Sequence, residues 1–412
     1  MNLTSKKSIL KILFWGFWIV LGIVIYFRHG SDFDIFYKGA HAIIFGYSPY
    51  YLDPGEVFTP FRYPPSFALL FSPLALLPQG VAKEIWYAMN VFSFILTMIL
   101  LWKMRKGWGL SEKEGVRSFL IAFLLSLPFI VYHLSVGQSK LFMLFFLVAS
   151  FYAVEKGKDF WGGLCLIISV VIYFPLILFI LFFFLKRNFK FLFGVVLGIV
   201  LWFYILPSFF FGIKGNILFL KEWYQTLVGP YLAHPESFGH ESSGILKLSS
   251  QSLPSAFARL FSVQPGGRWS LYLHENLIDF SPRTLHFLLK GISYMMIGLS
   301  SLVLLGKRGP HVRLLEYSLF LILAFLLPSY SLTYNWALLF VPYLGLLSYM
   351  EGTVNPKGRC FARMVGGLSV LASFSVISDF LRAISGLFWG TFILWLGILL
   401  IVLFTPKYTL RL

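Results

Sequence analysis

Residues 84–102 read EIWYAMNVFSFILTMILLW, and the basic stretch KMRK follows at 103–106. A helix needs about 20 predominantly apolar residues to cross the hydrocarbon core of a bilayer. The run has that length, and the basic residues behind it are typical of the cytoplasmic end of a span. This stretch therefore predicts a membrane-spanning helix that ends in the cytoplasm.

The composition of the whole chain agrees with that stretch. Of the 412 residues, 58% are hydrophobic and 12% are charged, and the mean hydropathy is +0.79. Soluble domains carry about 25% charged residues, so this chain has too little polar surface to cover a globule and needs lipid as its solvent. The net charge of +17 is explained by basic loops that fix topology, and no RNA-binding or zinc-finger pattern indicates a nucleic-acid partner. The two cysteines, Cys165 and Cys360, form no disulfide framework and no metal motif.

Apolar runs of span length recur near 9–27, 84–102, 118–134, 191–209, 284–305, 362–379 and 386–404. Shorter runs lie near 141–154, 161–173, 175–185, 315–327 and 335–350. Together they predict an all-α polytopic membrane protein of about 12 transmembrane helices, in one domain that covers residues 1–412. The first run is too long for the core of a signal peptide, and no cleavage site follows it, so we interpret it as an uncleaved first span.

Basic residues predict the orientation of these spans. The segments 1–11, 103–117, 155–160, 186–190, 306–314, 351–363 and 405–412 hold 21 of the 34 Lys and Arg residues. Short loops rich in Lys and Arg stay in the cytoplasm. The bias therefore places both termini inside and the alternate loops outside.

Two of the predicted outer loops are long, at 28–83 and 210–283. Loops longer than about 15 residues are usually functional or disordered. These two are rich in aromatic residues, Pro and Gly, so we expect them to fold against the membrane surface. Within the first loop, 34–46 predicts a short helix in the interface, and the proline-rich stretch 64–78 predicts a kinked interfacial or half-inserted piece.

Two acidic residues, Asp32 and Asp34, directly follow the first predicted span. A carboxylate at the outer surface can act as a general base for a sugar hydroxyl. Taken alone, Asp32 is more typical of a helix cap and Asp34 of a first helical turn. Their Asp-x-Asp spacing is also a weak metal-binding signal, so a role for a divalent metal stays open.

Further candidates are spread over the outer segments. Arg62, in the stretch FRYPP, can pair with a phosphate or with lipid headgroups. Gln138, in the stretch GQSK at 137–140, can hydrogen-bond a sugar, although the stretch also suits a plain turn between helices. The second long loop carries His and Glu residues without metal-ligand spacing, so it predicts no metal site and at most a sugar or phosphate subsite.

Read in order, these stretches resemble the polyprenol-phosphate-mannose-dependent mannosyltransferases of glycosyltransferase family 87, which belong to the GT-C class. Residues 31–50 read SDFDIFYKGAHAIIFGYSPY and residues 61–78 read FRYPPSFALLFSPLALLP. The family pattern there resembles Asp-x-x-Val-Tyr, then Gly-x-x-Pro-Tyr, then Tyr-Pro-Pro, with Asp32 at the position of the catalytic aspartate. Gly137-Gln138 and the run Gln251-Ser252-Leu253 with Arg259 resemble later motifs. Relatives often carry a Lys at the position of Ile172, and an Asn at that of Lys140.

The resemblance implies a GT-C-like bundle with interfacial helices in the outer loops and Asp32 as the base. It implies a hexosyltransferase without a cofactor, which moves mannose from a polyprenyl-phosphate donor to a glycolipid or glycan acceptor. The reaction would take place with inversion on the outer face of a bacterial or archaeal plasma membrane. Candidates for the donor phosphate are Arg62, Lys140 and Arg259, and candidates for sugar or acceptor contacts are Tyr63, Gln138, His240, Glu241 and Gln251.

Other classes of membrane protein remain as alternatives. A lipid-linked-sugar ligase or polymerase, or a flippase, would also have a large outer loop and handle lipid-linked sugars. A secondary transporter would place ionisable residues at mid-membrane. The predicted spans hold almost no charged residues, which counts against ion-coupled transport.

Overall fold

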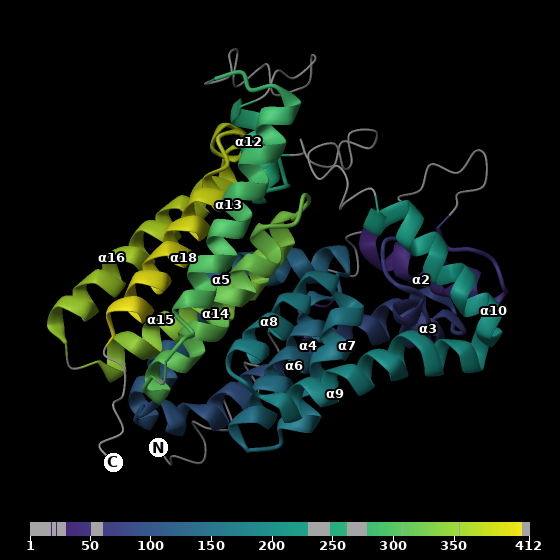
Figure 1. Ribbon diagram of the computed structural model, residues 1–412, viewed down its shortest axis with the longest axis horizontal. Helices are drawn as coiled ribbons and strands as arrows, with labels where there is room; N and C mark the ends of the chain where they lie inside the picture. Colours follow the sequence, from purple (N-terminus) through teal and green to yellow (C-terminus); the bar gives the residue numbers. More distant parts are fainter. Residues whose placement is uncertain are drawn as a thin grey trace.

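The computed structural model describes Trp18, Gly22 and residues 30–50, 61–229, 248–261, 278–306, 308–353 and 355–405. Most of these residues are helical, and the β pairing among them is limited to an isolated antiparallel bridge between Ser250 and Leu332. The predicted all-α class is therefore confirmed for the described part of the chain (Figure 1). The α-helices are α2 (Ser31–Ile44), α3 (Pro65–Ala75), α4 (Gln79–Met104), α5 (Glu112–Val136), α6 (Lys140–Glu155), α7 (Asp159–Ile172), α8 (Leu178–Leu185), α9 (Phe189–Ile199), α10 (Leu206–Trp223), α12 (Leu253–Phe261), α13 (Pro282–Leu302), α14 (Pro310–Leu326), α15 (Phe340–Gly352), α16 (Pro356–Ser373), α17 (Asp379–Ala383) and α18 (Gly386–Phe404).

Six helices among the described residues are long and apolar enough to cross a membrane, which makes the chain an integral membrane protein. They match six of the seven full-length apolar runs predicted from the sequence. The seventh run, 9–27, lies outside the described residues apart from Trp18 and Gly22. The predicted total of about 12 spans is not confirmed. The six helices are Gln79–Trp108, Glu112–Val136, Phe189–Thr226, Pro282–Leu302, Pro356–Ile377 and Gly386–Phe404.

The shorter apolar runs also fold as helices, but these are short for a bilayer. For example, α7 has 14 residues, which at a rise of 1.5 Å per residue cover about 21 Å of a core about 30 Å thick. The chain breaks after α7 because Pro175 has no N–H to continue the helix. Tyr173 is extended there, and a 3₁₀ turn, η2 (Phe174–Ile177), leads into α8. The two apolar runs predicted at 161–173 and 175–185 are therefore separate short helices.

The longest apolar helix bends sharply at Gly212. Pro207 cannot donate to the carbonyl of Phe203, four residues earlier, and Asn216 Nδ2 donates to that oxygen instead, at 2.9 Å. Gly212 adopts φ 70° and ψ 159°, a conformation open essentially to glycine alone. Beyond it the chain folds back, so that the ring centroid of Trp223 lies 6.4 Å from that of Phe203. The first part of the predicted outer segment 210–283 is therefore helical.

The returning part of α10 packs with α2 and α3 at one end of the molecule (Figure 1). Ser66 on α3 donates to the carbonyl of Trp202 at 2.6 Å, and Ser48, just after α2, donates to Glu222 Oε2 at 2.6 Å. The helix predicted within 34–46 is confirmed as α2, which begins at Ser31. The proline-rich stretch folds as α3 with Pro73 inside it.

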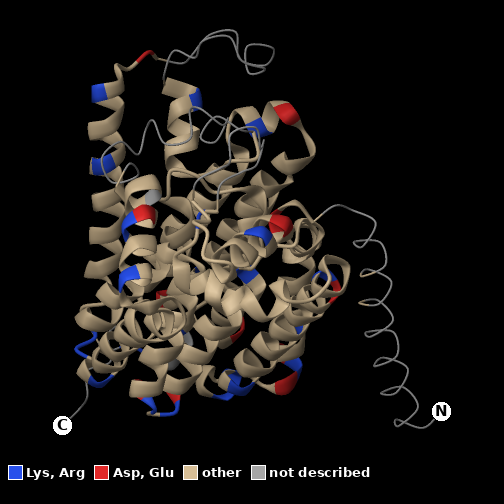
Figure 2. Cartoon of the chain, turned by 90° about the vertical axis from the view of Figure 1, so that its right-hand side faces the viewer, with Lys and Arg blue, Asp and Glu red and all other residues tan. Residues whose placement is uncertain are grey.

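Segments predicted to be cytoplasmic meet at the opposite end of the bundle. Lys186 Nζ lies 2.8 Å from Glu316 Oε2, and Arg117 forms an ion pair with Glu351. Figure 2 shows Lys and Arg residues together with Asp and Glu residues at the end near the C-terminus. The loops that the charge pattern predicted to share one side of the membrane therefore do lie at one end of the structure. Which end faces the cytoplasm stays a prediction.

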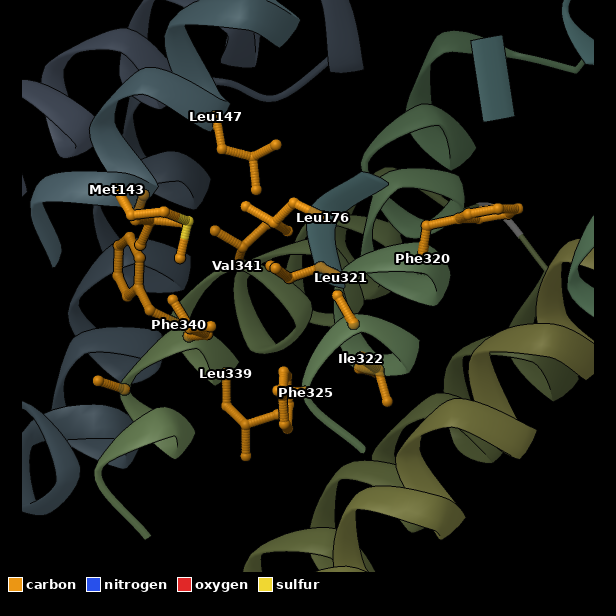
Figure 3. Close-up of a cluster of buried hydrophobic side chains, with 14 of the residues drawn as sticks. Met143, Leu147, Leu176, Phe320, Leu321, Ile322, Phe325, Leu339, Phe340 and Val341 are labelled. Carbon is orange, nitrogen blue, oxygen red and sulfur yellow. The ribbon is translucent and has the colours of Figure 1, made fainter. Parts of the chain in front are cut away.

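A fully buried apolar core joins α6 and η2 to α14 and α15. Met143 and Leu147 from α6 lie with Leu176 from η2, Phe320 from α14 and Val341 from α15 (Figure 3). Protein interiors are packed as densely as organic crystals. This core therefore fixes α6 rigidly, and with it the turn at the start of α6.

Helices α7 and α9 approach each other through glycines. A Cβ at Gly163 would lie 2.2 Å from the carbonyl oxygen of Phe191, and one at Gly194 would lie 2.1 Å from that of Phe160. Small residues let helix backbones pack closely in membranes. The close contact between α7 and α9 therefore requires glycine at both positions.

Replacing Gly163 with alanine is expected to destabilise the protein by about 1–3 kcal/mol, because its methyl group would overlap a backbone oxygen. The midpoint of thermal unfolding in detergent measures the effect. Gly367→Ala is the matched control, since a Cβ there meets nothing within 4 Å, and it is expected to leave the midpoint unchanged or slightly higher. Equal midpoints for the two variants would contradict the packing argument.

Candidate active site

The acidic residues predicted from the sequence lie in the first turn of α2. Gly30 is the N-cap residue, and Phe33 and Phe36 anchor the helix in the core. Asp34 Oδ1 accepts a hydrogen bond of 2.8 Å from Gln79 Nε2. Asp34 is thus hydrogen-bonded to the start of α4, while Asp32 accepts a hydrogen bond from a different partner.

That partner comes from the turn between α5 and α6. Helix α5 ends at Val136 and is followed by Gly137, whose φ of 73° favours glycine. A Cβ on Gly137 would lie 2.7 Å from Cβ of Phe33, so the turn packs directly on α2. Gln138 Nε2 donates to Asp32 Oδ2 at 2.9 Å, and Gln138 Oε1 accepts from the N–H of Ser139 at 3.1 Å. The second bond sets the direction of the amide, so that its NH₂ group faces Asp32.

Two cations of this region rest on tyrosine rings. Lys140 is 4% exposed, and its Nζ lies 5.4 Å from the ring centroid of Tyr63 and 4.2 Å from that of Tyr173. Arg62 Cζ lies 5.3 Å from the ring centroid of Tyr330. Among the described residues neither cation has a carboxylate within salt-bridge distance. Aromatic faces attract cations but accept few of their hydrogen bonds, so both can still donate to an anion.

Charge couples these groups to Asp32. Burial raises the pKa of the Tyr63 hydroxyl, and the Asp32 carboxylate raises it further. Burial lowers the pKa of Lys140, in the outer turn, to about 7, and Asp32 opposes that fall. Coulomb interactions weaken with distance, so both side chains lie within electrostatic reach of the carboxylate.

Tyr330 and Tyr334, between α14 and α15, belong to the same region, although no motif in the sequence marks them. Burial raises the pKa of Tyr330 to about 12, with Arg62 lowering it and Asp32 raising it. Burial also raises the pKa of Tyr334, in the 3₁₀ helix η7 (Thr333–Leu339), and Asp32 again adds to the rise. Both hydroxyl groups therefore lie close enough to Asp32 to respond to its charge.

Arg259 and Gln251 occupy a second, buried polar cluster. Arg259 Nη1 donates to the carbonyl of Ser250 at 2.7 Å and its Nη2 donates to Ser385 Oγ at 2.6 Å. Gln251 Nε2 donates to the carbonyls of Leu248 and Arg382 at 2.7 and 2.9 Å. Burial lowers the pKa of Arg259 to about 9. The side chains of these two residues therefore connect residues 248–250 with residues 382–385.

The remaining predicted residues, His240 and Glu241, lie outside the described part of the chain. Within the residues that are described, no group of three or more His, Cys, Asp or Glu side chains is arranged to hold a metal ion. The site that the structure assembles around Asp32 thus consists of Gln138, Lys140, Tyr63 and the neighbouring tyrosines, with Arg62 at its edge.

Comparison with known proteins gives one family match. The model of glycosyltransferase family 87 matches residues 61–329, well over half of the chain. The matched region contains Arg62, Tyr63, Gln138 and Lys140, whereas Asp32 precedes it. No curated protein matches the sequence.

Proposed function

The chain belongs to glycosyltransferase family 87, and from this we propose that it moves a hexose, specifically mannose, from a polyprenyl-phosphate sugar to a glycolipid or glycan acceptor. The transfer proceeds with inversion at the outer face of a bacterial or archaeal plasma membrane, with both termini in the cytoplasm. Membership of a glycosyltransferase family favours this reaction over flipping or ion-coupled transport.

The observation that carries the donor assignment is a pair of cations, Lys140 within electrostatic reach of Asp32 and Arg62 at the edge of the site. Lys140 is almost completely buried, and it contacts tyrosine rings where a carboxylate would normally lie. A buried charge without an ionic partner is costly, so such a site favours a ligand that brings a negative charge. A lipid phosphate supplies one, and Arg62 can add bidentate hydrogen bonds to the same group.

In the proposed reaction, Asp32 acts as the base and the two cations, Lys140 and Arg62, stabilise the leaving group. Asp32 removes the proton of the acceptor hydroxyl, and the oxygen then forms a bond to C1 of the sugar from the side opposite the phosphate. The bond between C1 and the phosphate oxygen breaks, and its electron pair leaves with the polyprenyl phosphate. Lys140 and Arg62 stabilise the negative charge that develops there.

The other residues of the region orient the reactants. Gln138 holds the Asp32 carboxylate through the hydrogen bond to Oδ2. Tyr63, with Tyr330 and Tyr334, supplies aromatic faces and hydroxyl groups for the sugar or the acceptor. Arg259 and Gln251 act indirectly. The backbone N–H of Gln251 donates to the carbonyl of Ser331, between Tyr330 and Tyr334, and the Arg259 side chain binds the carbonyl of the preceding residue, Ser250. His240 and Glu241 remain candidates for acceptor contacts.

The direct test is transfer of radiolabelled mannose by the purified wild-type protein, with cell-envelope extract as acceptor. We expect label in the product from a short-chain polyprenyl-phosphate mannose and none from a nucleotide-linked mannose. Label from the nucleotide sugar in the absence of lipid carrier would contradict the donor assignment. If only another polyprenyl-phosphate hexose served as donor, mannose would be the wrong sugar, but the assignment of a lipid-phosphate donor would stand.

A further inference from the structure

The turn that carries Gln138 and Lys140 is held by a histidine with no role in the chemistry above. His133 lies in the last turn of α5 and is fully buried. Its backbone carbonyl accepts from the N–H of Gln138 at 3.2 Å, and the carbonyl of Leu134 accepts from Gly137 at 3.2 Å. These two bonds form a Schellman motif, the common end of a helix at a left-handed glycine.

The ring of His133 reaches across the same turn to the next helix. The first N–H groups of any helix lack partners within it, and Ser139, the N-cap residue of α6, makes no side-chain cap bond. His133 Nε2 accepts from the N–H of Leu141 at 3.3 Å, and Asn90 Oδ1 on α4 accepts from that of Phe142 at 3.3 Å. Helix α6 is therefore capped by residues of other helices.

Acceptance at Nε2 fixes the chemical state of the ring. A nitrogen that accepts from an amide carries no proton, so the neutral ring has its proton on Nδ1. A charged imidazolium would have donors at both nitrogens and could not cap α6. The geometry thus requires neutral His133 in the Nδ1–H form.

We propose that His133 is a positioning residue for the transfer reaction, because it binds both sides of the turn that places Gln138 against Asp32 and Lys140 against Tyr63. This inference rests on the proposed function. The backbone carbonyl of His133 fixes Gln138, and its ring fixes the first turn of α6, of which Lys140 is the first residue. Small displacements of reacting groups can cost about 100-fold in rate.

Two substitutions that differ by one methylene group separate this role from packing. In His133→Gln the amide oxygen can reach the position of Nε2 and still accept from Leu141. In His133→Asn the shorter amide replaces Nδ1 instead and leaves that N–H without an acceptor. We expect kcat for mannose transfer to fall about 10- to 100-fold in the Asn variant and by less than about threefold in the Gln variant.

Ser126→Ala is the matched control, because Ser126 is also fully buried on α5 and its hydroxyl has no hydrogen-bond partner among the described residues. Its kcat should equal that of the wild type. Equal kcat values for the Asn and Gln variants of His133 would overturn the proposal. The double variant His133→Asn/Gln138→Ala gives a further test. If its fold-loss in kcat equalled the product of the two single fold-losses, the proposal would also be overturned, because the effects of residues that act through one turn are not additive.

A second readout does not depend on activity. In protein labelled with ¹⁵N-histidine, the ring signals absent from His133→Gln belong to His133, and they should show a protonated Nδ1 and an unprotonated Nε2. A protonated Nε2 would overturn the proposed contact. If the wild type transfers no mannose while this signal is as expected, the proposed function fails and the capping role of His133 stands.

Discussion

Replacing Asp32 with asparagine is expected to lower mannose transfer by about 10²- to 10⁴-fold, the contribution that a positioned general base makes to a rate. Asparagine has nearly the same shape, and its side-chain oxygen can still accept from Gln138, but it cannot take the proton of an acceptor hydroxyl. Initial rates with saturating lipid donor measure the loss. Asp32→Ala should lose as much.

The matched control is the neighbouring carboxylate in the same helical turn. Asp34→Asn retains an oxygen for the hydrogen bond from Gln79, so we expect its rate to stay within a few-fold of the wild type. Unchanged thermal midpoints for both variants would show that the fold persists. Full activity in Asp32→Asn, or an equal loss in Asp34→Asn, would remove Asp32 as the base.

Replacing Lys140 with methionine is expected to lower kcat/KM for the donor by about 10²- to 10³-fold, the effect of removing one group that stabilises developing charge. The thermal midpoint should rise at the same time. Methionine has a similar length and no charge, and burying a charge without an ionic partner is unfavourable. If Lys140 acts in the active site, Lys140→Met should lower activity and raise stability, whereas damage to the fold would lower both.

Lys190→Met is the control for this pair of measurements, because Lys190 is exposed at the start of α9. We expect neither its activity nor its midpoint to change. Wild-type donor efficiency in Lys140→Met would contradict the phosphate assignment.

The pH dependence gives an independent check on Lys140. Burial lowers its pKa to about 7, so in the free protein the ammonium group is populated below that pH and lost above it. The profile of kcat/KM reports groups of the free enzyme. Donor efficiency should therefore fall as the pH rises through about 7, and Lys140→Met should lack this limb.

Part of the candidate site could be predicted from the sequence because those residues lie in short, ordered motifs. Asp32 follows the first apolar run, and Gln138 and Lys140 follow the third, where an outer turn was expected. Tyr334 and His133 carried no such local signal. His133 is one polar residue inside an apolar helix, and its contact with Leu141 depends on how α5 meets α6.

Two of the expected residues have a different environment from the one their motifs indicate. Arg259 and Gln251 lie in the family-like run of the second outer loop, yet their side chains are bonded to Ser385 and to the carbonyl of Arg382. No pattern in residues 251–259 could indicate those partners, because they come from the far end of the chain.

The sequence by itself determined that the chain lies in a membrane, where its long spans are and which loops share an end. Those features follow from the length of apolar runs and the distribution of charge, which are local properties. Tertiary structure alone decided that Gln138 meets Asp32 across 106 residues and that Lys140 rests on Tyr63 and Tyr173. Such contacts depend on the rotation and packing of whole helices, and many rotations satisfy the same hydrophobic pattern. Close packing, as between Gly137 and Phe33, selects one of them.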